Sequence, residues 1–192
     1  MDDMEYKNHT DLVVIGGSAG SLQVILEMIR HLRPHLDFSI LLVIHRKAQA
    51  ANILPTLLQQ YAEQQVIEIE DKTEIEANKI YLVPADYHLL LDSRELMSLD
   101  RSERINYSRP SIDITFISAA EIFGENLVAV LLSGANADGV EGFKYIKKKG
   151  GRVWIQDPES AEISYMPQQA VNLVDYDLLF SPEDLAGLIN HL

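Results

Sequence analysis

The sequence predicts a three-layer α/β/α fold, in which helices cover both faces of a doubly wound, mostly parallel sheet that carries a short antiparallel hairpin. Short continuous apolar runs recur along the chain, as is typical of strands buried on both faces of a parallel sheet. Segments with apolar residues at helical spacing follow many of these runs, and this alternation favours right-handed crossovers. A glycine-rich turn joins the first strand to the first helix.

In the first half of the chain, two strand–helix units precede several short strands. The first helix ends before Pro34, because proline disfavours a helical conformation in the preceding residue. Pro55 is tolerated because it lies in the first turn of the second helix. The expected elements are a strand at 11–15, the turn 16–20, a helix at 22–33, a strand at 39–44, a helix at 52–64, and strands at 66–70, 80–83, 87–91 and 96–99, the last two joined by a hairpin turn at 92–95.

In the second half, strands and helices alternate after a polar, irregular stretch at 101–111. Pro167 can open a helix, because the first helical position needs no N–H donor. Ser181, followed by acidic residues, is typical of a helix N-cap. The expected elements are a helix at 112–123, a strand at 127–132, a helix at 140–149, a strand at 152–156, the helix opened by Pro167, a strand at 176–180 and a final helix after Ser181.

The length of 192 residues suits one folded domain, which we expect at residues 11–192 behind a polar tail at residues 1–10. In doubly wound folds, ligands gather at the carboxyl ends of the strands, near the reversal in strand order. The turns that follow strands are therefore the places where we expect chemistry.

The composition excludes several functional classes. The 29 acidic against 16 basic residues give a net charge of -13, which argues against nucleic acid as a partner. The compact basic run 147–149 is best explained as cations at a helix C-terminus. The absence of cysteine excludes a disulfide framework, a thiolate metal site and a cysteine nucleophile. With a polar, acidic N-terminus and no apolar run of about 20 residues, we expect a soluble, cytoplasmic protein without membrane insertion.

The turn at residues 16–20 has the pattern G-x-S-x-G around Ser18. This pattern places a serine on a sharp strand-to-helix bend with its hydroxyl exposed. The N–H groups of the following helix N-terminus can stabilise an oxyanion. The same N-terminus can bind phosphate, and the turn by itself favours nucleotide or phosphate binding slightly over a nucleophile. It lacks the ending of a P-loop and the spacing of the dinucleotide fingerprint.

A serine nucleophile needs a base and a group that orients the base. Among the six histidines, His45 alone directly follows a buried strand, at the level expected for Ser18. Three acids occupy comparable positions after strands, and spacing does not choose among Asp86, Asp138 and Asp157. Each could instead bond to its own turn or cap a helix.

Together these segments resemble the catalytic domain of the CheB-type bacterial chemotaxis protein-glutamate methylesterases. The resemblance extends from about residue 12 to residue 179 and rests on ordered blocks rather than on any single motif. These blocks are Ile15-Gly16-Gly17-Ser18-Ala19-Gly20, His45 after its strand, Val83-Pro84-Ala85-Asp86-Tyr87-His88, Arg109-Pro110-Ser111-Ile112-Asp113, Leu132-Ser133-Gly134-Ala135-Asn136-Ala137-Asp138-Gly139 and Tyr165-Met166-Pro167-Gln168-Gln169-Ala170.

The resemblance implies that Ser18 is the nucleophile, His45 the general base and acid, and Asp138 the orienting carboxylate. Backbone N–H groups of Ala19 and Ala135 would form the oxyanion hole. The implied reaction is hydrolysis of glutamate γ-methyl esters on chemoreceptor helices or related signalling proteins, and glutamine deamidation uses the same acyl chemistry. It implies no organic cofactor and no metal.

The sequence departs from the family pattern at three places around this site. The family usually has methionine where Ala135 stands, so that side of the cleft should be more open. Ser21 replaces a usual glycine and could cap the helix. Arg46-Lys47-Ala48 replaces the Met-Pro that commonly follows the histidine, which changes the rim where a receptor helix would lie. With ten residues before the first strand, the receiver domain usual in the family has no room, so we expect a free-standing enzyme or a piece of a larger protein.

Two other functions compete with an ester hydrolase. A non-catalytic docking module in a signalling complex would keep the fold, and the changes at Ala135 and after His45 favour it. The other is nucleotide binding at residues 16–20, which lacks the supporting motifs described above.

Overall fold

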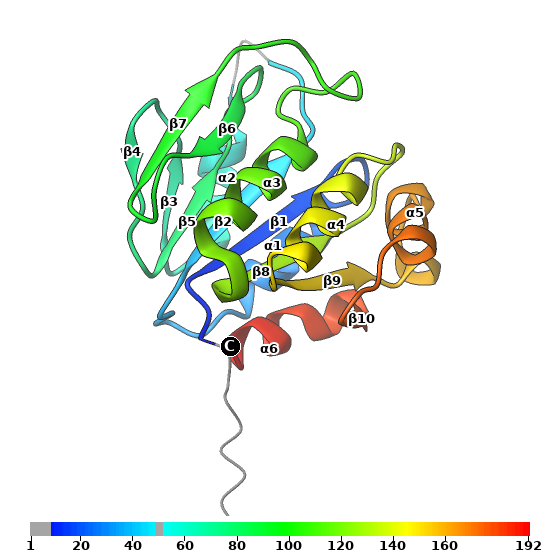
Figure 1. Cartoon of the computed structure of the whole chain (residues 1–192). Coiled ribbons are helices and arrows are strands. Elements are labelled where there is room, and N and C mark those ends of the chain that lie inside the picture. Colours follow the sequence, from blue (N-terminus) through cyan, green and yellow to red (C-terminus); the bar gives the residue numbers. More distant parts are fainter. Residues whose placement is uncertain (1–8, 49–51) are drawn as a thin grey trace, which may run out of the picture.

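A seven-stranded parallel sheet forms the centre of the molecule (Figure 1). The computed structural model describes residues 9–48 and 52–192. The strand order β10-β9-β8-β1-β2-β5-β3 places β1 at the middle of the sheet. The strands are β1 (Leu12–Gly17), β2 (Ser39–Ile44), β3 (Gln65–Glu68), β5 (Lys79–Leu82), β8 (Leu127–Leu131), β9 (Arg152–Gln156) and β10 (Leu178–Phe180).

Helices cover both faces of this sheet, which confirms the predicted three-layer fold. Alternate residues of β1 serve two separate cores: Leu12 and Val14 pack towards one layer, and Val13 and Ile15 towards the other. None of the helices in the described residues is long and apolar enough to cross a membrane. One layer contains α3 (Ile112–Phe123), α4 (Val140–Lys148) and α5 (Tyr165–Leu173), and the other contains α1 (Leu22–Arg30), α2 (Leu54–Tyr61) and α6 (Leu185–Asn190).

The predicted hairpin is present, but it belongs to a small sheet of its own. This antiparallel sheet has the order β4-β7-β6 and lies beside the β3–β5 edge of the main sheet (Figure 1). Its strands are β4 (Thr73–Glu74), β6 (His88–Leu91) and β7 (Leu96–Asp100). The sequence did not predict β4, because a two-residue strand is too short to show an alternating pattern.

Several helix boundaries differ from the prediction, and α2 spans only Leu54–Tyr61 of the helix expected at 52–64. The helix α1 ends at Arg30, earlier than expected, because Asn190 of α6 binds the backbone of the next turn through His31 and Arg33. The helix α5 begins at Tyr165, so Pro167 lies in its first turn rather than at its first position. The final helix starts as a 3₁₀ turn, and the Ser181 side chain makes no capping hydrogen bond. Two further 3₁₀ turns are at Gly124–Asn126 and Pro158–Ser160.

The strand order reverses at β1, which is the feature that positions the site. From β1 the chain adds β2, β3 and β5 on one side, and it later returns to add β8, β9 and β10 on the other. Gly16 of β1 lies opposite Val43 of β2 and Leu131 of β8. The carboxyl ends of these three central strands therefore open at one edge of the sheet, where ligands of such folds bind.

Two helical glycines provide a matched test of this packing. In Gly142→Ala the new methyl group would lie 2.6 Å from Phe116 Cβ, between α4 and α3. We expect the free energy of unfolding to fall by about 1–3 kcal/mol, measured by urea denaturation. At Gly187 in α6 an added Cβ meets nothing within 4 Å. Gly187→Ala should therefore leave the free energy of unfolding unchanged or raise it by about 0.5–1 kcal/mol. Equal effects of the two substitutions would contradict this account of the interface.

Candidate active site

The carboxyl ends of β1, β2 and β8 bring together the three residues predicted from the sequence. Ser18 follows β1 and His45 follows β2, and the His45 N–H donates to the Gly17 carbonyl at 3.0 Å. Asp138 lies in the loop after β8 and contacts His45. Ser18 and His45 line one cleft of about 550 Å³, and Asp138 is buried behind the imidazole.

The His45–Asp138 pair is the central contact of the site. Nε2 of His45 lies 2.6 Å from Oδ2 of Asp138, and the two side chains are 10% and 0% exposed. Burial raises the pKa of Asp138, but hydrogen bonds from His45, Asp113 and Ile112 outweigh this effect and hold the pKa below its ordinary value. Because an ionised carboxylate only accepts hydrogen bonds, Nε2 carries the proton and Nδ1 is left as the basic nitrogen.

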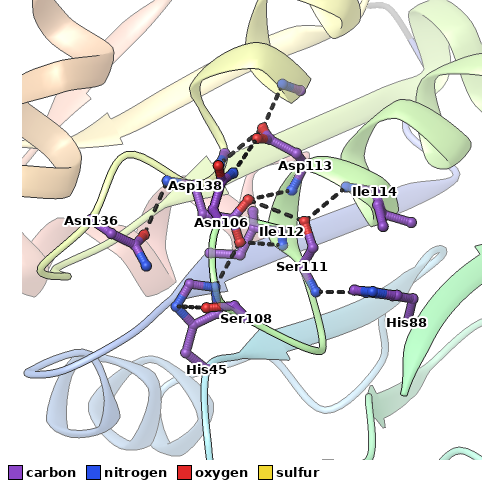
Figure 2. A network of polar contacts seen from close by, with 12 residues as sticks. His45, His88, Asn106, Ser108, Ser111, Ile112, Asp113, Ile114, Asn136 and Asp138 are labelled. Carbon is purple, nitrogen blue, oxygen red and sulfur yellow. Dashed lines mark hydrogen bonds and ion pairs between the residues drawn. The ribbon is translucent and has the colours of Figure 1, made fainter. Parts of the chain in front are cut away.

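The N-terminus of α3 holds the Asp138 carboxylate. Ile112 N donates to Oδ2 at 2.7 Å, Asp113 N donates to Oδ1 at 3.0 Å, and the Ser111 hydroxyl donates to Oδ1 at 3.2 Å (Figure 2). These N–H groups are the ones that a helix start leaves without partners, and the helix dipole there favours a negative charge. The helix start thus fixes the carboxylate and keeps it ionised.

A second carboxylate makes the reciprocal contact with the neighbouring helix. Oδ1 of Asp113, on α3, accepts from Gly139 N at 2.9 Å and Gly142 N at 2.7 Å, at the start of α4. Its Oδ2 accepts from the Asn106 amide at 3.2 Å. Burial and the negative charge of Asp138 raise the pKa of Asp113 to about 6. The N-terminus of α3 is therefore bound by Asp138, and the N-terminus of α4 is bound by Asp113 of α3 (Figure 2).

The nitrogen of His45 that is not bound to Asp138 faces a serine that the sequence did not single out. Ser108 Oγ lies 3.4 Å from Nδ1 (Figure 2). The Ser18 hydroxyl makes no hydrogen bond to any residue in the ranges 9–48 and 52–192. The arrangement also reverses the usual pattern of serine hydrolases, in which the carboxylate binds Nδ1 and Nε2 faces the nucleophile.

Close packing determines the shape of the serine turn. Gly20 has φ +82, and a Cβ there would lie 2.7 Å from Ser133 Oγ. A Cβ on Gly134 would lie 3.0 Å from the Cβ of Ser18, so the loop after β8 passes directly against the serine. Ser21 occupies the N-cap position of α1, but its hydroxyl donates to the Ser18 carbonyl rather than capping an N–H group.

Ala19 and Ala135, the predicted oxyanion donors, lie in the turns after β1 and β8. Both are exposed, and neither backbone N–H donates a hydrogen bond to another part of the described chain. The backbone leaves both N–H groups available, as an oxyanion site requires.

The other two candidate acids have partners away from His45. Asp86 accepts from Arg109 at 2.5 Å and from Arg101 at 2.8 Å, and these arginines, Arg109 first, hold its pKa below the ordinary value. Asp157 accepts from the Glu159 N–H and so caps a 3₁₀ turn. Of the three acids that spacing left open, Asp138 is the one that contacts His45. In the described part of the chain, no group of three or more His, Asp or Glu side chains is arranged to hold a metal ion.

The residues that support the pair had no role assigned from the sequence. Ser111 could have been recognised as an N-cap, since a serine directly before an apolar helical run is a common start signal. His88 is fully buried, and its Nδ1 accepts from Ser111 N at 3.1 Å while its Nε2 lies 2.8 Å from the Glu103 carbonyl. No local pattern indicates Ser108, which reaches His45 across 63 positions.

Comparisons with known proteins agree on one family. A family model described as CheB methylesterase matches residues 13–189. A Leptospira interrogans protein named for protein-glutamate methylesterase and protein-glutamine glutaminase is 36% identical over 182 residues, which cover 95% of this chain and 94% of that protein. The protein-glutamate methylesterase/protein-glutamine glutaminase of Pseudoalteromonas translucida is 35% identical over 85% of this chain, which spans 43% of that relative. The crystal structure of the Thermotoga maritima CheB methylesterase catalytic domain matches with a TM-score of 0.88 and 30% identity, covering 95% of this chain and 98% of that one.

The raised pKa of Asp113 predicts a pH-dependent stability. The folded protein keeps this proton up to about pH 6, whereas an unperturbed aspartate releases it near 3.8, so stability falls as pH rises through this window. In Asp113→Asn the side-chain oxygen can still accept from Gly139 and Gly142, without a charge beside Asp138. When the pH is raised from about 4.5 to 7.5, we therefore expect the free energy of unfolding of wild type to fall on the order of 1–3 kcal/mol relative to that of the variant. Urea denaturation at the two pH values measures this difference. Asp113→Ala, which removes the acceptor, should be less stable than wild type at both pH values. If the difference in unfolding free energy between wild type and Asp113→Asn did not change with pH, the raised pKa of Asp113 would be refuted.

Proposed function

The chain belongs to the CheB methylesterase family, and we propose that it is a serine hydrolase that removes γ-methyl esters from glutamate side chains of chemoreceptor-like signalling proteins. In this proposal, Ser18 is the nucleophile, His45 the general base and acid, and Asp138 the orienting carboxylate, within a catalytic domain at residues 11–192. The observation that carries the proposal is the buried 2.6 Å contact between His45 and Asp138 at the back of a cleft that Ser18 also lines. Deamidation of glutamine proceeds through the same acyl chemistry, so we include it as a second reaction of the same site.

The first half of the reaction transfers the acyl group to the enzyme. Nδ1 of His45 removes the Ser18 proton as Oγ attacks the ester carbonyl, which gives a tetrahedral oxyanion. For this step the Ser18 hydroxyl must take the place that the Ser108 hydroxyl occupies on Nδ1. The C–O bond to the methoxy group then breaks, and methanol leaves with the proton from His45.

The second half releases the product. Water gives a proton to Nδ1 as it attacks the acyl-serine. His45 returns this proton to Oγ of Ser18 as the C–O bond to the serine breaks, and the glutamic acid product then releases its own proton to solvent. The ionised Asp138 stabilises the imidazolium in both halves, because its pKa stays below the ordinary value. The free N–H groups of Ala19 and Ala135 are our candidates for binding the oxyanion.

The charge of the cleft fits a glutamate-bearing polypeptide. Four basic side chains line it, against the single acid Asp86: Arg46, Lys47, Arg104 and Arg109. The whole chain carries a net charge of -13, so the cleft is a basic site on an acidic protein. Such a site attracts carboxylate-rich segments and orients their approach.

One observation favours a second candidate, a docking module that binds signalling proteins without turnover. The basic nitrogen of His45 faces Ser108, and Ser18 has no hydrogen bond within the described residues. A module of this kind would bind the receptor segment in the same cleft but release no methanol.

Removal of the nucleophile separates these two functions. We expect Ser18→Ala to lower methanol release from a methyl-esterified receptor cytoplasmic fragment by at least about 10³-fold, with little change in thermal stability. Ser108→Ala is the matched control, because it removes the hydroxyl that now faces His45, and it should retain turnover. Loss of activity in Ser108→Ala alone would make Ser108 the nucleophile, and no release by folded wild type would favour the docking module.

Removal of the orienting charge tests the third role. We expect Asp138→Asn to lower kcat on the order of 10³–10⁴-fold while leaving measurable activity, since Ser18 and His45 remain. The amide would also place an N–H donor against a donor at the start of α3, so thermal stability should fall as well. Asp157→Asn, which changes another acid that follows a strand, should behave like wild type. A wild-type rate in Asp138→Asn would remove Asp138 from the mechanism.

A further inference from the structure

We propose that Tyr107 is a specificity-determining residue that contacts the polypeptide carrying the ester, rather than the ester itself. The inference rests on the proposed function and concerns the same cleft, which Tyr107 lines together with Ser18 and His45. The Tyr107 residue is 97% exposed. No hydrogen bond, ion pair or aromatic contact joins its side chain to another residue within 9–48 and 52–192.

The backbone around Tyr107 is a tight two-residue turn. Ile105 and Ser108 form an antiparallel bridge and exchange both backbone hydrogen bonds, at 3.1 and 2.9 Å. The two residues between them, Asn106 and Tyr107, have φ values of 51 and 62. These values are typical of a type I′ turn, in which glycine is the preferred second residue and an aromatic residue is disfavoured. The chain thus has a tyrosine where the turn itself favours glycine.

Both neighbours of Tyr107 are anchored to the site. The Asn106 amide donates to Oδ2 of Asp113 at 3.2 Å, and Ser108 Oγ lies 3.4 Å from Nδ1 of His45 (Figure 2). Because the residues on either side face inwards, the turn holds the aromatic side chain outwards at the mouth of the cleft. The side chain therefore meets an incoming polypeptide without a rearrangement of the loop.

The surroundings of Tyr107 indicate the chemistry of its partner. Arg104, three residues earlier, is exposed. Its distance to Asp86, 3.6 Å, is longer than the distances from Arg101 and Arg109 to the same carboxylate. Lys47, which also lines the cleft, forms no ion pair within the described residues. An aromatic side chain flanked by basic groups fits an acidic polypeptide segment that also offers an apolar surface, and tyrosine and arginine are the residues most enriched in binding hot spots. We therefore assign the contact to such a segment on the substrate protein.

Glycine substitution tests this assignment without a penalty in folding. Tyr107→Gly introduces the residue that the turn prefers, so its melting temperature should equal or exceed that of wild type. We expect KM for the methyl-esterified receptor fragment to rise about tenfold or more, as for loss of a hot-spot residue. The same variant is assayed with p-nitrophenyl acetate, an ester without a polypeptide, and kcat/KM for the fragment should fall at least about tenfold more than for this small ester.

Two further variants complete the comparison. Tyr107→Phe keeps the ring and should retain most of the affinity for the fragment. Tyr176→Ala removes another exposed tyrosine, next to the edge strand β10, and should leave KM for the fragment at the wild-type value. A KM in Tyr107→Gly within twofold of wild type would overturn the inference. Equal losses on the fragment and the small ester would also overturn it, because they would assign Tyr107 to the chemistry.

A binding measurement distinguishes failure of this inference from failure of the proposed function. Fluorescence anisotropy with the labelled fragment compares Ser18→Ala with the double variant Ser18→Ala/Tyr107→Gly, so that turnover has no influence. A Kd about tenfold or more higher in the double variant supports the contact even if wild type hydrolyses neither ester. Equal Kd values refute the contact even if wild type is an active esterase.

Discussion

The contact between the Asp138 carboxylate and the first N–H groups of α3 connects the fold to the site. The carboxylate satisfies donors that the helix start leaves open, and the same donors keep the carboxylate ionised next to His45. Asp113 makes the corresponding contact with the start of α4. Two helix starts and the loop after β8 are thereby joined, so the orientation of the imidazole depends on how α3 and α4 pack.

This arrangement places two buried carboxylates next to each other, and their protonation differs. Asp138 accepts hydrogen bonds from Nε2 of His45 and from two helix N–H groups, and their effect on its pKa outweighs that of burial. Burial and the negative charge of Asp138 raise the pKa of Asp113 to about 6, and no basic side chain among the described residues offsets them. Two neighbouring charges in a buried site repel each other, so Asp113 takes up a proton at a higher pH than Asp138 does. Below about pH 6 the network therefore keeps the negative charge on Asp138, the residue that faces His45.

The loop at residues 101–111 connects the wall of the cleft to the same network. Asp86 binds Arg101 and Arg109 near the two ends of this loop, and the Arg109 guanidinium also donates to carbonyls at its start. Asn106 and Ser108 then fix the tip to Asp113 and His45. A loop fixed at both its base and its tip presents its exposed side chains in a defined direction, so the cleft wall and the His45–Asp138 pair are parts of one hydrogen-bonded assembly.

The sequence by itself determined the layers of the fold, the strands at the centre of the sheet, and the positions of Ser18 and His45 at strand ends. These features follow from local patterns, because burial on both faces produces continuous apolar runs and a sharp strand-to-helix turn requires glycine. Spacing alone did not distinguish Asp138 from the other acids that follow strands, and the resemblance to a family supplied this choice. Only the tertiary structure decided which acid meets the imidazole, which of its nitrogens is left basic, and that Ser108 and Asp113 complete the network. The reason is physical: His45 and Asp138 are 93 positions apart, so their contact depends on the order of β1, β2 and β8 and on the packing of α3 against α4, which no local pattern encodes.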